Sequence, residues 1–239
     1  MFVRRLFSRI SRKSVSSIFI ELFLIIVGVL SALAVENYRQ SILEQNMEVD
    51  YLIALRKAVR ADTAMLNRDI QKYFKKQKAC KTFLELIESG KPLDQEEFEM
   101  SAEAIIMNVD PFYNTAIFED LKTSGHLQII SNEDLRNAMM EYYILVDHLS
   151  EVHIQNLFEI SYNPFFTDLL TFREYAFEDE LNQSGIVAQL KERKDSQLYL
   201  KRLQKRSYTF YSTLLFNSLP RSQNLLEEID QELVKRGIE

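Results

Sequence analysis

Hydrophobic and polar residues divide the chain into one long apolar run and a series of amphipathic segments. The run from Ile18 to Val35 reads IFIELFLIIVGVLSALAV, eighteen residues with one charge, Glu21. As a helix it is roughly 27 Å long, close to the ~30 Å hydrocarbon core of a bilayer. The pattern therefore predicts a membrane-spanning helix at residues 18–35.

A second pattern follows the apolar run and extends to Gly90. Its apolar residues recur at steps of three and four: Leu52, Leu55, Val59, Leu66, Ile70, Tyr73, Phe83, Leu84 and Ile87. This spacing predicts an amphipathic helix that continues from the membrane span, although Asp62 interrupts its apolar face. Gly90 followed by Pro92 is typical of a helix C-terminus and is expected to end it.

Breaks in the pattern separate the remaining elements. They lie near 90–93, 109–114, 123–126, 163–164, 184–186 and 219–221, and helices are expected over 94–108, 114–125, 131–163, 165–181, 195–218 and 220–236. Asp94, with Glu97, and Ser131 are expected to cap two of these helices. With only 5 Gly and 4 Pro in 239 residues, the predicted fold class is all-α, a bundle of long and short helices.

The distribution of basic residues predicts the orientation of the span. Five basic residues precede it, Arg4, Arg5, Arg9, Arg12 and Lys13. Only Arg39 lies within about 15–20 residues of its other end. The positive-inside rule then predicts a short basic cytoplasmic tail at 1–17, a transmembrane helix at 18–35 and an extracytoplasmic helical domain at 36–239.

A cleavable signal peptide is the alternative interpretation of the same segment. Ala32-Leu33-Ala34 fits an A-x-A cleavage site. Against cleavage, Glu21 lies within the apolar run, and the helical pattern continues past the cleavage point without Gly or Pro until Gly90. The sequence favours an uncleaved anchor.

The candidate contact residues lie on one stripe of the predicted span and on the row beside it. They are Glu21, Gly28, Ser31 and Ala32. Gly28 and Ala32 form a small-xxx-small pair, which allows two membrane helices to approach closely, although small residues are also common in membrane helices generally. Glu21 either reaches the headgroups or pairs with Arg12 or Lys13, or it contacts a partner. The expected partners are membrane lipid and, through this helix, another protein or a second copy of the chain.

Charge excludes one class of partner for the rest of the chain. Subtracting the five basic and one acidic residues of 1–35 from the totals of 29 and 35 leaves residues 36–239 with a net charge of −10. Nucleic-acid binding requires a basic surface. No nucleic-acid partner is therefore expected.

Motifs of catalysis are missing from the sequence, which contains no P-loop, G-x-S-x-G, H-E-x-x-H or paired C-x-x-C pattern. His148 and His153 are five residues apart and point about 140° apart on a helix, which disfavours a shared metal. Cys80 and His126 lack the activated-nucleophile pattern. The aromatic residues Tyr142, Tyr143, Tyr162, Phe165 and Phe166 are expected to pack in a core rather than line a pocket. The prediction is a non-enzyme without catalytic, cofactor or metal residues.

Two stretches resemble an uncharacterised family of bacterial single-span membrane proteins. In ELFLIIVGVLSALAVENY (21–38), the family's acidic entry, apolar run and Asn-aromatic ending fall on Glu21, Gly28, Ala32, Leu33, Asn37 and Tyr38, with Tyr38 where Trp is more usual. The stretch LKTSGHLQIISNEDLRNAMMEYY (121–143) is similar to the family's middle region. The resemblance implies an anchored helical protein of the bacterial inner (cytoplasmic) membrane and implies no activity.

Two functional classes follow from these patterns. The first is a membrane-anchored, non-enzymatic scaffold or interaction subunit of the cell envelope. The second is an extracytoplasmic sensor domain that binds a small ligand between its helices. A tail of about 17 residues is too short for a transmitter domain, so a sensor needs a separate signalling partner, and the first class is preferred.

Overall fold

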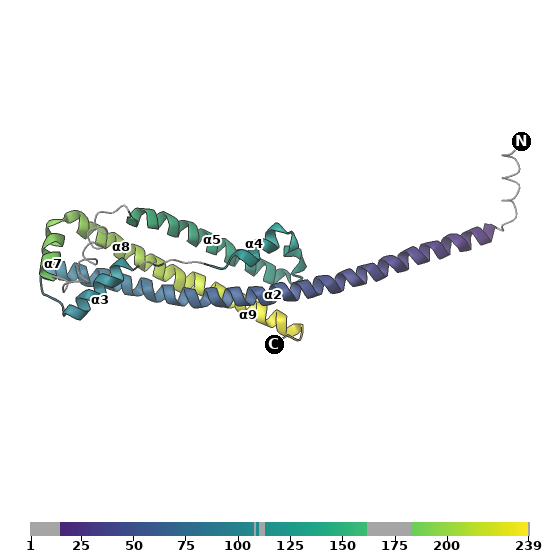
Figure 1. Ribbon diagram of the computed structural model, residues 1–239, viewed down its shortest axis with the longest axis horizontal. Helices are drawn as coiled ribbons and strands as arrows, with labels where there is room; N and C mark the ends of the chain where they lie inside the picture. The colour runs from purple at the N-terminus through teal and green to yellow at the C-terminus, as the bar shows by residue number, and fades with distance from the viewer. Residues whose placement is uncertain (1–14, 108, 110–112, 162–182, 239) are drawn as a thin grey trace, which may run out of the picture. The chain divides into compact units, whose positions relative to one another are not determined.

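The fold is all-α, as predicted. The computed structural model describes residues 15–107, 109, 113–161 and 183–238, and the side chains of all of these except 15–16 and 153–161; none of the described residues forms a strand. The helices are α2 (Val15–Ser89), α3 (Gln95–Ile106), α4 (Ala116–Thr123), the 3-10 helix η1 (His126–Ile129), α5 (Glu133–Ser161), α7 (Gln183–Glu192), α8 (Lys194–Thr213), the π-helical segment η2 (Leu214–Ser218) and α9 (Leu219–Lys235) (Figure 1).

The chain divides into two compact units, residues 1–50 and 51–239. Residues of helix α2 belong to both units. The predicted span and the predicted amphipathic helix after it are therefore parts of this one helix. In the first unit, every residue from 18 to 35 is exposed. Gly90 follows the helix with a φ of 66°, a left-handed conformation that glycine adopts without strain, and so ends α2 where predicted.

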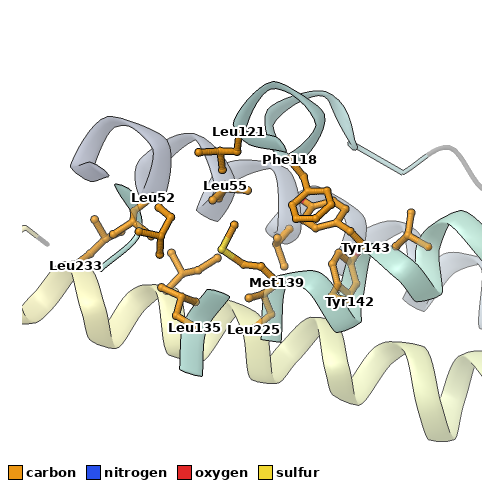
Figure 2. Close-up of a cluster of buried hydrophobic side chains, with 14 residues drawn as sticks. Leu52, Leu55, Phe118, Leu121, Leu135, Met139, Tyr142, Tyr143, Leu225 and Leu233 are labelled. Carbon is orange, nitrogen blue, oxygen red and sulfur yellow. The ribbon is translucent and has the colours of Figure 1, made fainter. Parts of the chain in front are cut away.

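The second unit is a helical bundle with three clusters of buried side chains. Helices α3 and α7 lie at one end of it (Figure 1), where they pack with α2 and α8 around Phe83 and Phe98. The largest cluster joins α2, α4, α5 and α9 (Figure 2). The third joins α2, α5, η2 and α9 around Leu66 and Leu149. The predicted apolar positions of α2 are buried in these clusters, with Leu84 partly buried.

Asp94 occupies the N-cap position of α3, as predicted, but the predicted capping box does not form, and the cap predicted at Ser131 is wrong. The Asp94 side chain makes no capping bond, and only its carbonyl accepts from Phe98 N–H. The N-cap of α5 is Asn132 rather than Ser131, because the Asn132 side-chain oxygen accepts from Leu135 N–H at 3.2 Å. The error at Ser131 arises because Ser131 and Asn132 both carry capping side chains and stand next to each other, and the sequence does not tell which one has the required backbone geometry.

The predicted break at 219–221 is also wrong, because α8, η2 and α9 follow one another without interruption. Pro220 has no N–H, and in an α-helix its ring clashes with the carbonyl of Phe216. The chain accommodates it with the π-helical turn, in which Leu219 N–H bonds the carbonyl of Leu214.

The predicted break at 184–186 lies inside α7 and is likewise wrong. Gly185 costs about 1 kcal/mol relative to Ala in a helix interior. Burial of Ile186, Val187 and Leu190 offsets that cost. The predicted break at 163–164 and helix at 165–181 lie outside the described residues.

Candidate functional site

Three features of the described residues are candidate sites: the apolar face of α2, a buried polar cluster at Asp62 and a groove between α5 and α8. The first carries the sequence-predicted residues Glu21, Gly28, Ser31 and Ala32. At about 100° per residue, Gly28 and Ala32 lie about 20° on either side of Glu21, whereas Ser31 lies about 80° away. Helix geometry thus brings three of the four onto one narrow face.

This face is open in the single chain. All four residues are exposed, and a Cβ added at Gly28 would meet no atom within 4 Å. Helix α2 contains an apolar window that could cross a membrane, with a mean hydropathy of 2.8 in that window and none of the window buried. The exposed surface of this window suits lipid or another helix. The proposed partners of Glu21, Arg12 and Lys13, lie outside the described residues.

Asp62 is fully buried and forms the centre of a polar cluster in the bundle. Its Oδ1 accepts from the backbone N–H of Asn114 at 2.9 Å and from the Asn114 side-chain amide at 2.7 Å. Its Oδ2 accepts from the Tyr142 hydroxyl at 3.1 Å. Thr63 follows Asp62 on α2, and its hydroxyl lies 2.6 Å from the hydroxyl of Ser222 on α9. The break in the apolar pattern at Asp62 therefore marks a bonded polar connection between α2, α5 and the segment before α4.

Burial dominates the electrostatics of this cluster. It raises the pKa of Asp62, while hydrogen bonds from Asn114 and Tyr142 act in the opposite direction. Burial and the nearby Asp62 charge also raise the pKa of Tyr142 and Tyr143. With its carboxylate enclosed and bonded by three donor groups, Asp62 connects α2 with α5 and with the segment before α4.

The aromatic residues predicted to form a core do so where they are described. Tyr142 and Tyr143 are buried, and the Tyr143 ring stacks on Phe118 with centroids 4.3 Å apart (Figure 2). Tyr162, Phe165 and Phe166 lie outside the described residues.

The discounted nucleophile and metal candidates have ordinary structural surroundings. Cys80 is buried, which raises the pKa of its thiol to about 12, far from that of an activated nucleophile. His126 Nδ1 lies 3.1 Å from the Tyr51 hydroxyl, which itself donates to Asp120 at 2.8 Å. His148 is exposed, the side chain of His153 is outside the described ones, and no metal-binding group of His, Cys, Asp and Glu occurs among the residues described.

A groove of about 620 Å³ between α5 and α8 was not predicted from the sequence. Its lining comprises Leu145, His148, Leu149, Val152, Arg202, Lys205, Arg206, Thr209, Phe210, Thr213 and Asn217. The available signal was the spacing of Arg202, Arg206, Thr209 and Thr213, which repeats at three and four residues and forms one polar face of α8. Recognising a groove also required knowing that α5 lies opposite, which the sequence does not show.

The chain is thus an all-α protein, and within its described ranges one helix could span a membrane. Comparison with protein-family models, with curated proteins and with solved structures found no match. The resemblance to the bacterial single-span family therefore stays a prediction.

Proposed function

We propose that the protein is a membrane-anchored, non-enzymatic scaffold or interaction subunit of the bacterial cell envelope. Residues 18–35 anchor it in the inner membrane, residues 1–17 face the cytoplasm, and residues 36–239 lie outside it. The observation that carries this proposal is the fully exposed apolar window of α2, since such a surface is stable in lipid or against another helix and costly in water.

Two further observations support an interaction role. Gly28 and Ala32 share the narrow, open face of α2 with Glu21, an arrangement suited to close contact with another membrane helix. In the bundle, the buried carboxylate of Asp62 is occupied by internal hydrogen bonds, which suits a structural role.

A sensor domain is the second candidate, and one observation favours it. The groove between α5 and α8 combines apolar side chains with Arg202, Lys205 and other polar groups that converge on one volume. Small-molecule sites have this composition. A sensor would still need a separate signalling partner.

Topology is tested with the full chain in a bacterial host. A reporter enzyme that is active only outside the cytoplasm is fused after Glu239, and the same fusion without residues 1–35 is the control. We expect activity only with the span present, and N-terminal analysis should find Met1–Ala34 retained. Mature chains that begin at Val35 would overturn the anchor in favour of a signal peptide.

Partners are tested by pull-down of the tagged full chain from native membranes in mild detergent, with identification by mass spectrometry. An interaction subunit is expected to retain a defined protein that the Gly28→Leu variant loses. Recovery of the chain alone and monomeric, with and without the substitution, would contradict the interaction role.

A further inference from the structure

The groove between α5 and α8 has a cationic wall. Arg202, Lys205 and Arg206 all come from α8, and within one turn Arg202 and Arg206 lie about 40° apart on its surface. Thr209 and Thr213 continue the same face; the Thr209 hydroxyl donates to the Lys205 carbonyl at 3.0 Å, and the Thr213 hydroxyl adds a donor to the groove. The wall therefore presents cationic and neutral hydrogen-bond donors together.

This concentration of positive charge contrasts with the rest of the domain, since residues 36–239 carry a net charge of −10. Among the described residues, Arg202 and Lys205 have no carboxylate partner, whereas Arg206 already takes part in an interaction. Asp147 and Glu151 of α5 are exposed, and neither is part of the groove lining. Charge complementarity thus favours an anion in this groove.

The α5 side of the groove is apolar except for the exposed side chain of His148. Leu145, Leu149 and Val152 contribute from α5, and Phe210 contributes from α8. Phe210 is held in place by stacking on Tyr73 of α2, with centroids 5.1 Å apart and the planes at 9°. An apolar surface fixed in this way beside a cationic wall fits a ligand with one charged end and one apolar end.

We propose that this groove binds a small organic anion whose phosphate or carboxylate contacts Arg202 and Lys205 and whose apolar body lies against Val152 and Phe210. Arginine and lysine with neighbouring hydroxyls recognise such oxyanions by charge-assisted hydrogen bonds. A volume of about 620 Å³ suits a molecule of this size. The proposal concerns the helical domain alone and does not depend on the membrane topology.

Phenyl phosphate is a suitable probe, and the full chain in nanodiscs of zwitterionic lipid is titrated with it by calorimetry. We expect saturable binding of phenyl phosphate, weaker binding of inorganic phosphate and none of phenyltrimethylammonium. The double variant Arg202→Gln/Lys205→Gln should bind phenyl phosphate about tenfold more weakly, because two charge-assisted hydrogen bonds are lost. The variant Lys194→Gln/Lys201→Gln removes the same charge from exposed sites of α8 outside the groove and should bind as the wild type does.

Circular dichroism of each variant confirms that α8 remains folded, and Lys205→Gln alone provides a second, milder test at an exposed position. Equal weakening by both double variants would overturn the site in favour of non-specific charge attraction, and absence of saturable binding would overturn it outright. Equal affinity for inorganic phosphate would overturn the role of the apolar surface. Repeating the titration in discs that contain phosphatidylglycerol identifies the source: reduced affinity means that a lipid headgroup occupies the groove, and unchanged affinity means a soluble anion.

Discussion

Tyr142 of α5 donates a hydrogen bond of 3.1 Å to Oδ2 of Asp62 on α2, joining two positions 80 residues apart in the chain. Both side chains are buried, and the other oxygen of Asp62 is occupied by two donors from Asn114. A buried donor that loses its acceptor destabilises the fold by more than its hydrogen bond stabilised it. Asp62, the acceptor for all three donors, is therefore the residue on which this cluster depends most.

Replacing Asp62 by Ala should therefore destabilise the domain by about 2 kcal/mol, because three buried donors lose their acceptor. Asp62→Asn keeps an oxygen for Asn114 and an amide that can donate to the Tyr142 oxygen, so it should cost less than about 1 kcal/mol. Urea unfolding of the full chain in mild detergent, followed by circular dichroism, measures both. Equal losses for the two variants would show that the hydrogen bonds are unimportant.

The pH dependence of stability should also reflect Asp62. Burial raises the pKa of this carboxyl in the folded chain above its unfolded value of about 3.9. The folded state then binds more protons between the two values, so the contribution of Asp62 is full below about pH 4 and is lost as pH rises through the folded pKa. Asp62→Asn removes this titration, and its unfolding free energy should rise relative to wild type across that window. If the difference in unfolding free energy between Asp62→Asn and the wild type stayed constant with pH, the expectation would be contradicted.

Asn132 should matter more than Asp94, although the sequence makes both good cap candidates. Asn132 caps α5 through Leu135 N–H and also donates to Glu232 on α9 at 3.1 Å. Asn132→Ala should cost about 1 kcal/mol. Asp94→Ala, where no capping bond exists, should stay within about 0.5 kcal/mol of wild type. Urea unfolding compares the two variants, and the reverse order would restore the predicted capping box.

These cap residues illustrate what the sequence can and cannot predict. Periodicity identified the buried face of α2 from Leu52 to Ile87, because burial repeats every three or four residues regardless of the partner. Which residue caps a helix, and whether Pro220 breaks one, depends on backbone geometry that a π-helical turn or a neighbouring side chain can change.

For the candidate sites too, the sequence can place residues that share one helix, but it cannot show which helices lie next to each other. Glu21, Gly28 and Ala32 could be placed on one face because a single helix carries them, and Ser31 is displaced for the same geometric reason. The groove needed the relative placement of α5 and α8, and Asp62 needed Asn114 and Tyr142, which are distant in sequence. Non-local contacts of this kind leave only a local irregularity in the pattern.

Cys80 should be unreactive in the folded chain. It is completely buried, and its thiol pKa is raised to about 12 by burial, so almost no thiolate is exposed at neutral pH. Labelling by a maleimide reagent should be slow in native conditions and fast in concentrated urea, where the thiol returns to a pKa of about 8.5. Rapid labelling of the native protein would mean that α2, α3 and α7 do not stay packed around Cys80.

The face of α2 that contains Gly28 should mediate association in the membrane. A leucine at this position separates the backbones of two packed helices and should weaken association about tenfold. Val27→Leu is the matched control, because Val27 lies about 100° from Gly28 around the helix and tolerates the larger side chain. A genetic assay of membrane-helix association measures the homotypic contact, and pull-down of the full chain measures a heterotypic one. If Gly28→Leu leaves both unchanged, Gly28 reflects only the usual composition of membrane helices, and contact with partners must come from the helical domain instead.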